Sequence, residues 1–271
     1  MTTHHPFDQA IALEQTSPGE WRGAAIEAYG NMVGAFGGVV ASVLLNAVLR
    51  DERHQGHPVS MTVNFCSALS LGGFSIQATL QRGGKYTQHW NLVLRQGDTI
   101  CATASVVMGR RGEAFSHQPI EMPRVPVFED CAELPRLAPV NWVGQYEFRF
   151  AEGAPTVPGK GFETPQPARS AIWMRDRPER VLDYASLAAL GDSFILRLFQ
   201  VRDSIVPMGT VSLTTHFLAT PDEIAEQGSD PLLGVADSQR FHGNFHDQQM
   251  QLWGRSGKLL AVGSQVVWYK H

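Results

Sequence analysis

The same strand pattern occurs twice in this sequence, about 150 residues apart, and this duplication constrains the fold more than any other feature. Residues 60–65 read Ser-Met-Thr-Val-Asn-Phe, and residues 212–217 read Ser-Leu-Thr-Thr-His-Phe. Both alternate apolar and polar side chains with a period of two, which is typical of a half-buried β-strand. A repeat with a period of half the chain indicates two copies of one fold in tandem.

The elements around the repeated strand follow the same order in both halves. Each half is predicted to read β-α-β-β-β-β, with helices over 29–49 and 183–200. The other predicted strands are 19–27, 73–82, 86–96 and 100–108 in the first half, and 144–152, 232–241, 243–253 and 259–270 in the second. A long helix followed by antiparallel strands predicts an α+β layer in which each sheet curls around its helix.

The two copies are expected at residues 1–116 and 143–271. The segment 117–142 between them is rich in proline and acidic residues, which favours a linker rather than a packed element. The two sheets can pair edge to edge, which removes exposed edges and resembles a symmetric dimer within one chain. A homodimer or higher homo-oligomer of such chains is also possible.

The composition excludes several classes of protein. The chain has 271 residues, 43% of them hydrophobic, and a net charge of −4, so a large core is possible and nucleic acid is not an expected partner. No apolar run approaches the ~20 residues of a membrane span, and no signal peptide is apparent, so we expect a cytoplasmic protein. Cys66, Cys101 and Cys131 are expected to be reduced, the first two packed within strands.

One residue breaks the apolar stripe of the second predicted helix. Asp192 has Ala188, Ile195, Leu196 and Phe199 as its helical neighbours. An unpaired carboxylate in such surroundings costs several kcal/mol, so Asp192 is either a functional group or a boundary residue bonded to nearby backbone. The helix is predicted to have a separate polar face, formed by Ser186, Ser193, Arg197 and Gln200.

Two further polar residues stand at conspicuous positions of the second half. Gln265 lies in the last predicted strand, where a buried amide needs partners, and Thr210 begins the repeated strand. Taken singly, both could be ordinary strand residues. The first half has smaller or apolar residues at the three positions: Gly38 at the equivalent place in the helix, Pro58 before the repeated strand, and Ser105, which matches Gln265 when the turn glycines are aligned. This joint asymmetry predicts a site in the second copy only.

Other motifs give weaker indications. His242, His246 and Asp247 would suit a metal on a helix, but the stretch reads as a turn and a strand, so no metal site is predicted. The sequence has neither G-x-S-x-G nor G-x-x-x-x-G-K-[ST]. Gly37 and Gly38, near a helix start, indicate either backbone N–H groups for an anion or oxyanion, or tight packing of the helix.

These features together resemble the type II acyl-CoA thioesterases, which are double-hotdog proteins. The resemblance rests on Phe36-Gly37-Gly38, "PVSMTVNF" and "RGGK" in the first half, and on "ALGD", "GTVSLTTHF" and "GKLLAVGSQVVWY" in the second. It implies a tandem hotdog fold and an acyl-CoA substrate. In that family an aspartate on the second helix, a threonine or serine at the next strand's start and a glutamine in the last strand hold the hydrolytic water. They correspond to Asp192, Thr210 and Gln265.

The implied reaction is hydrolysis of an acyl-CoA to a free acid and CoA, without a cofactor or covalent intermediate. Backbone N–H groups near Gly37 and Gly38 would bind the thioester oxygen. Arg82, Lys85 and Arg240 are possible partners for the CoA phosphates. Two alternatives remain: a hotdog hydratase or dehydratase, which generally needs a histidine that neither predicted helix has, and a non-catalytic acyl-CoA binder, in which the three polar side chains would diverge.

The strand alternation raises a difficulty for Thr210. It shares parity with Ser212 and Thr214, the face expected to point away from the helix. The strand must therefore be bulged or bent between Thr210 and Leu213 if Thr210 is to meet Asp192.

Overall fold

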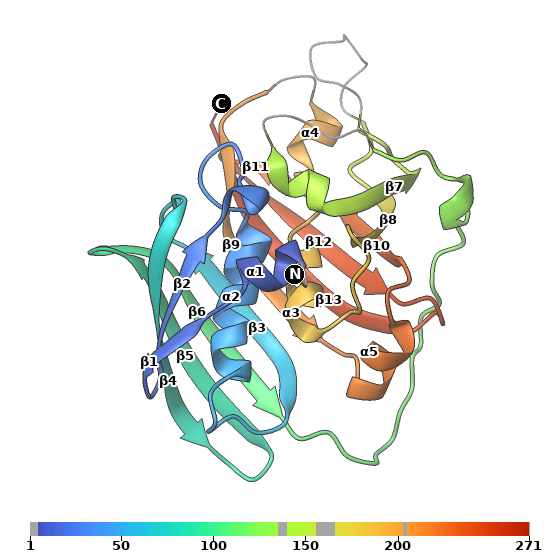
Figure 1. The fold of residues 1–271 in the computed structure, drawn as a ribbon. Coiled ribbons are helices and arrows are strands. Elements are labelled where there is room, and N and C mark those ends of the chain that lie inside the picture. Colours follow the sequence, from blue (N-terminus) through green and yellow to red (C-terminus); the bar gives the residue numbers. More distant parts are fainter. Residues whose placement is uncertain (1–4, 135–139, 156–165, 203–204, 271) are drawn as a thin grey trace.

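The two copies of the repeated strand pair with each other at the centre of the molecule. The computed structural model describes residues 5–134, 140–155, 166–202 and 205–270. Strands β3 (His57–Phe65) and β9 (Met208–Phe217) run antiparallel, with Thr62 opposite Thr214. Figure 1 shows the resulting arrangement, a blue-to-green half-sheet joined to one coloured from yellow-green to red. The predicted edge-to-edge pairing of the two sheets is confirmed.

Among the described residues, thirteen strands form one antiparallel sheet whose order is mirrored about the β3–β9 junction. Outward from β3 the first half has β6 (Thr99–Gly109), β5 (Thr87–Gln96), β4 (Gly72–Gly83), β2 (Glu20–Ala25) and β1 (Glu14–Ser17). Outward from β9 the second half has β13 (Leu259–Tyr269), β12 (Phe245–Trp253), β10 (Leu232–Asp237), β8 (Ser170–Asp176) and β7 (Tyr146–Glu152), with the short β11 (Phe241–His242) beside β12. The predicted α+β tandem hotdog architecture is confirmed.

Two helices lie side by side between the half-sheets, α2 (Gly37–Leu49) and α3 (Tyr184–Leu190) (Figure 1). The hydroxyl of Ser42 donates to the carbonyl oxygen of Ala185 over 2.7 Å and links them. Most of α2 is buried on all sides, as expected for a helix at the centre of a core. The shorter helices are α1 (Pro6–Ala10), α4 (Leu198–Val201) and α5 (Pro221–Gln227), with 3₁₀ turns at Glu27–Tyr29, Phe128–Asp130 and Asn141–Gln145.

The second helix is shorter than the predicted 183–200. It ends at Leu190, and the backbone N–H groups of Asp192 and Ser193 then bond three residues back, to Ala189 and Leu190. Such bonds tighten the last turn and let the chain leave the helix axis before α4 begins. The expected polar face does not form at the surface, because Ser186, Ser193, Arg197 and Gln200 are all buried.

Several elements differ from the predicted β-α-β-β-β-β order. A pair of neighbouring strands, not a single strand, precedes each central helix, so that β2 corresponds in the sheet to β8 rather than to the predicted strand that became β7. Strand β8 is buried along almost its whole length, which hides the two-residue period. Helix α5 was also not predicted.

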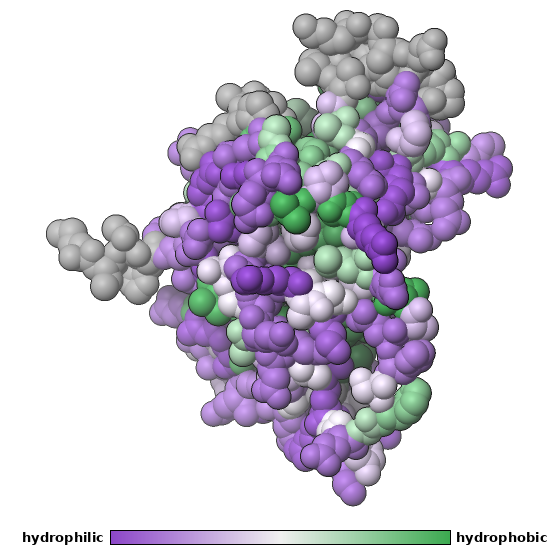
Figure 2. All heavy atoms as spheres, turned by 90° about the vertical axis from the view of Figure 1, so that its right-hand side faces the viewer, coloured by the Kyte–Doolittle hydropathy of each residue, from purple (hydrophilic) through white to green (hydrophobic). Residues whose placement is uncertain are grey.

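The segment 117–142 is not a free linker over its described residues. Phe128 and Cys131 are buried against an outer cluster that includes Trp173 and Trp253. The indole N–H of Trp173 donates to the carbonyl oxygen of Pro126 over 2.9 Å. Seen from the right-hand side of Figure 1, where this segment runs, the surface is mostly hydrophilic, with a smaller hydrophobic area in its upper half (Figure 2). The segment therefore covers apolar residues on the outer face of the second half-sheet.

The three cysteines are free thiols. Cys101 is buried in β6, as predicted, whereas Cys66 is exposed just after β3, so its predicted packing role is wrong. None of the helices in the described part of the chain is both long and apolar enough to cross a membrane.

The close approach of α2 and α3 makes a prediction for Gly38. A Cβ atom there would lie 2.5 Å from the carbonyl oxygen of Ala189 and would also collide with the Phe36 ring. We expect Gly38→Ala to lower the free energy of unfolding by about 1–3 kcal/mol, because the helices must separate. Urea denaturation would measure this. Gly209→Ala is the control, since a Cβ at Gly209 meets no atom within 4 Å, and equal stability of both variants would contradict the expectation.

Candidate functional site

Asp192 lies in the turn that ends α3, facing the first turn of α2. Its Oδ1 accepts a hydrogen bond of 2.6 Å from the side-chain Nε2 of Gln265, and the backbone N–H of Gly38 also favours the negative charge of the carboxylate. Its Oδ2 lies against Gly37, where a Cβ atom would be only 2.5 Å away. The carboxylate of the second half thus meets the helix N-terminus of the first half, where N–H groups and the helix dipole favour negative charge.

Gln265 and Thr210 come from the paired strands β13 and β9. Gln265 is 2% exposed and lies opposite Leu213, which places it among the core-facing side chains. Thr210 is opposite Val267 while Ser212 is opposite Val266, so one extra residue, Val211, bulges out of β9 between them. The bulge turns the side chain of Thr210 to the core-facing side of the sheet. There its Oγ1 donates to Oε1 of Gln265 over 3.5 Å. The bulge predicted between Thr210 and Leu213 is confirmed.

The register of the sheet corrects one of the matched positions in the first half. Met61, the counterpart of Leu213 in the repeat, pairs with Val106, so the structural counterpart of Gln265 is Val106 and not Ser105. The turns before β6 and β13 differ in length, which shifted the alignment on their glycines by one residue.

The counterpart of Asp192 in the first helix also differs from the predicted one. Asp192 is nine residues after the N-cap Asp183, and nine residues after the N-cap Phe36 is Leu45, not Gly38. Leu45 and Val106 are both fully buried. The first half therefore has apolar core residues where the second half has a carboxylate and an amide, which sharpens the asymmetry between the two copies.

Burial dominates the electrostatics of Asp192. It raises the pKa of this carboxyl to about 7, and the hydrogen bonds from Gln265 and Gly38 lower it only in part. The residue remains partly exposed. A carboxyl with a pKa near neutrality that can reach solvent is suited to accept a proton and to return it.

Two residues of this site were not predicted to take part in it. Gln248 on β12 donates from Nε2 to Oε1 of Gln265 over 3.3 Å, and Arg197 donates from Nε to Oε1 of Gln248 over 3.3 Å. Gln248 is fully buried. The sequence did contain a signal for Gln248. The two-residue period of a strand places this polar residue on the same face as Met250 and Leu252.

The predicted glycines lie at this site, but with different roles. The N–H of Gly38 faces the Asp192 carboxylate and lowers its pKa. The N–H of Gly37 precedes it at the first position of α2, where helix geometry provides no intrahelical acceptor.

The predicted basic residues are divided between two ends of the molecule. The turn with Arg82 and Lys85 lies beside His57, at the start of β3. Thr210 lies beyond the pair of Asn64 with Ser212, towards the end of β3. The structure therefore separates Arg82 and Lys85 from the site along the length of a strand.

The histidine stretch forms a strand and a turn, as predicted. The carboxylate of Asp247 accepts hydrogen bonds from the backbone N–H groups of Gln239 and Arg240, and so fixes the turn before β11. His246 is buried and His242 is exposed. Within the described ranges, no group of three or more potential ligands is placed to hold a metal ion.

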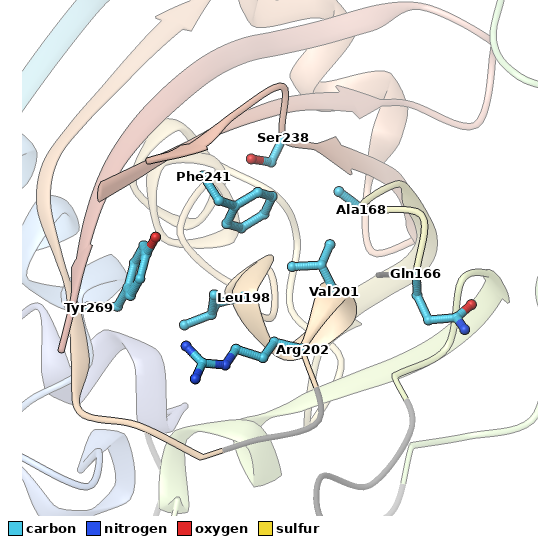
Figure 3. Close-up of a pocket in the computed structure, with 8 residues that line it drawn as sticks. All are labelled: Gln166, Ala168, Leu198, Val201, Arg202, Ser238, Phe241 and Tyr269. Carbon is cyan, nitrogen blue, oxygen red and sulfur yellow. The ribbon is translucent and has the colours of Figure 1, made fainter. Parts of the chain in front are cut away.

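A pocket of about 600 Å³ lies next to α4. In Figure 3, Leu198, Val201 and Arg202 line one side of it and Phe241 the other, with Tyr269 from the end of β13 nearby. The lining does not include Asp192, Thr210 or Gln265, so the pocket does not contain the site, although Leu198 of α4 and Tyr269 of β13 follow Asp192 and Gln265 along the chain. Arg240 follows Ser238, another lining residue, along the chain.

Comparison with known proteins gives matches over both halves. Residues 26–109 match the family model of the acyl-CoA thioesterase N-terminal domain, and residues 128–269 match that of the acyl-CoA thioesterase C-terminal domain. No curated protein matches the chain.

Solved structures match nearly the whole chain. A conserved protein of unknown function with a hot dog fold from Alicyclobacillus acidocaldarius is 37% identical, with 99% of each chain covered and a TM-score of 0.93. A putative thioesterase II from Thermobifida fusca is 18% identical over 100% of both chains, with a TM-score of 0.83. An acyl-CoA thioesterase II from Mycobacterium marinum is 16% identical over 98% of both chains, with a TM-score of 0.76.

The raised pKa of Asp192 predicts a pH-dependent stability. The folded protein binds this proton more tightly than the unfolded chain, so the contribution of Asp192 to stability is complete below about pH 4 and is lost as the pH rises towards 7. The effect is on the order of 2–4 kcal/mol. In Asp192→Asn this part of the pH dependence of the free energy of unfolding should be absent.

Urea denaturation of both proteins at about pH 4.5 and 7.5 would measure the difference. Asp176, whose pKa burial also raises to about 7, contributes to both proteins alike and cancels. An identical pH dependence of the wild type and Asp192→Asn would contradict the expectation.

Proposed function

The chain belongs to the acyl-CoA thioesterase family, and from that premise we propose that it hydrolyses an acyl-CoA to a free carboxylic acid and CoA with a water molecule activated by Asp192. The observation that carries the proposal is the 2.6 Å hydrogen bond between Gln265 and Asp192, with Thr210 on the same amide. This convergence supports hydrolysis over the passive binding of an acyl-CoA, which needs no polar cluster of this kind.

The hydrogen bonds leave a defined set of groups for the water. Oε1 of Gln265 accepts from Thr210, and one Nε2 hydrogen is donated to Asp192. The second Nε2 hydrogen and the lone pairs of the Thr210 oxygen remain. A water that donates to Asp192 and Thr210 and accepts from Gln265 keeps one lone pair for attack. Such fixed orientation reduces the entropic part of the barrier.

The reaction then follows in two steps. In the first step the oxygen of the water bonds to the thioester carbon while Asp192 takes a proton from that water. The carbonyl oxygen of the thioester becomes an oxyanion. The Gly37 N–H, at the positive end of α2, is the proposed donor to this oxygen. Collapse of the intermediate breaks the carbon–sulfur bond, and the leaving CoA sulfur takes the proton from Asp192.

The pocket beside α4 is the proposed site for the nucleotide end of CoA. Phe241 and Tyr269 offer aromatic rings for an adenine, and Arg202 offers a guanidinium for a phosphate. Arg240 is exposed beside this pocket and adds a second positive charge. Of the basic residues predicted from the sequence, it is therefore the one retained in the proposal.

Asp192→Asn is the direct test of the general base. With acyl-CoAs of graded chain length, we expect the wild type to release free CoA thiol and the variant to lose about 10²–10⁴-fold in kcat/KM. Below saturation, the wild-type rate should rise with pH through about 7, because only the ionised carboxylate accepts a proton. Ser264→Ala, an exposed neighbour of Gln265, is the control. Full turnover by a folded Asp192→Asn protein would exclude this mechanism.

Thr210 is tested by a pair of substitutions. Thr210→Val removes the hydroxyl but keeps the shape, and we expect kcat to fall roughly tenfold because the water loses an acceptor. Thr210→Ser keeps the hydroxyl and should retain most of the activity. Steady-state kinetics would compare the two, and equal loss in both variants would assign Thr210 to packing instead.

A further inference from the structure

A row of side-chain hydrogen bonds continues past Gln265 into the interior of the second half. Nε2 of Gln248 donates to Oε1 of Gln265, and Oε1 of Gln248 accepts from Nε of Arg197, both over 3.3 Å. Arg197 is 1% exposed and Gln248 is fully buried. Four polar groups therefore follow one another from Arg197 to Asp192.

The chemistry of the two ends fixes the direction of this row. A guanidinium can only donate hydrogen bonds and an ionised carboxylate can only accept them, whereas an amide turned by 180° exchanges its donors and acceptor. With Arg197 at one end and Asp192 at the other, each amide oxygen must face Arg197 and each N–H must face Asp192. A turned amide would place two donors or two acceptors against each other, which is costly in a buried network.

Arg197 is itself held firmly in this position. Its Nη1 donates to Oγ of Ser170 over 2.7 Å and to the carbonyl oxygen of Ala168 over 3.1 Å, and its Nε also donates to the carbonyl oxygen of Ile195 over 2.9 Å. No carboxylate forms a salt bridge with it among the described residues. Burial lowers its pKa to about 10, so it remains a cation at neutral pH.

We propose that Arg197 and Gln248 are positioning residues that hold the amide of Gln265 with its N–H towards Asp192, and so keep Asp192 in the ionised form that accepts a proton. Neither residue touches the reacting atoms. The catalytic consequence rests on the proposed function, whereas the orientation of the amides rests on the contacts alone.

The surroundings of Asp192 leave few other influences on its protonation. The groups that face it are Gly37 and Gly38 from α2, Gln265 from β13 and, across Gly37, the Phe65 ring at the end of β3. In the described part of the chain no charged side chain contributes to the pKa of Asp192. Among the described residues, the charged or titratable side chains that interact electrostatically with Arg197 are Asp237 and His246.

Gln248→Met tests the row, because methionine has a similar length and no amide. Gln249→Met is the matched control, since Gln249 is the next residue of β12 and its side chain is exposed on the other face. The Asp192 carboxyl would be titrated by ¹³C NMR and assigned by its absence in Asp192→Asn. We expect Gln248→Met to raise the Asp192 pKa by about one unit and Gln249→Met to leave it unchanged.

Kinetics give a second readout. In Gln248→Met the pH at which kcat/KM reaches half its plateau should move upward by the same amount, with kcat at pH 7 reduced about fivefold and KM little changed. A role in packing alone would lower the amount of folded protein without moving this pH. If Gln248→Met folds poorly, Gln248→Glu keeps the contact with Arg197 and replaces the N–H with an ionised oxygen that cannot donate to Gln265. Its charge is paired with Arg197, and we expect a shift in the same direction.

An Asp192 titration in Gln248→Met that coincides with the wild type would overturn the proposal. The outcome is separable from that of the proposed function. If the wild type hydrolyses no acyl-CoA but the Asp192 pKa shifts in Gln248→Met, the hydrolase assignment is wrong and the positioning role of Arg197 and Gln248 is supported. If hydrolysis occurs and neither the titration nor the kinetic profile moves, the row fails and the hydrolase assignment stands.

Discussion

The antiparallel pairing of β3 with β9 is the contact on which the rest of the structure depends. It joins two half-sheets into one and places Thr62 opposite Thr214, near the local twofold axis that relates the two halves. The two central helices are thereby brought side by side, so that the end of α3 meets the start of α2. A carboxylate at the end of one helix can then face N–H groups at the start of the other. The candidate site is a consequence of joining the copies, and neither copy would form it alone.

The second constraint is that a carboxylate at this position is poorly solvated. Donors from Gln265 and Gly38 offset part of the free-energy cost of this desolvation, and the pKa of Asp192 remains near 7. The first copy avoids the cost altogether, because its matched positions are Leu45 and Val106. The duplication therefore yields one polar site per chain, with the other copy contributing helix α2 and the packing around it.

Much of this arrangement could be predicted from the sequence, for physical reasons that also set the limit. The alternation in 60–65 and 212–217 predicted the paired strands, and the parity of Thr210 predicted its bulge. The end of α3 at Leu190 could not be read from periodicity, since apolar spacing continues past it. Strand β8 is buried on both faces over most of its length, which hides its two-residue period. The start of α5 is marked in the sequence by the capping pair Thr220 and Glu223, followed by no apolar period long enough to predict a helix. The bonds of Gln248 and Arg197 depend on register between distant strands, which a single sequence does not contain.

In the mechanism that we propose, a water molecule activated by Asp192 attacks the thioester directly. A single turnover in H₂¹⁸O with enzyme in excess tests this claim, followed by mass spectrometry of the released acid and of the peptide that contains Asp192. The mechanism predicts one ¹⁸O atom in the free acid and none in Asp192. Incorporation of ¹⁸O into the Asp192 carboxyl would reveal an acyl-enzyme anhydride and would contradict the mechanism.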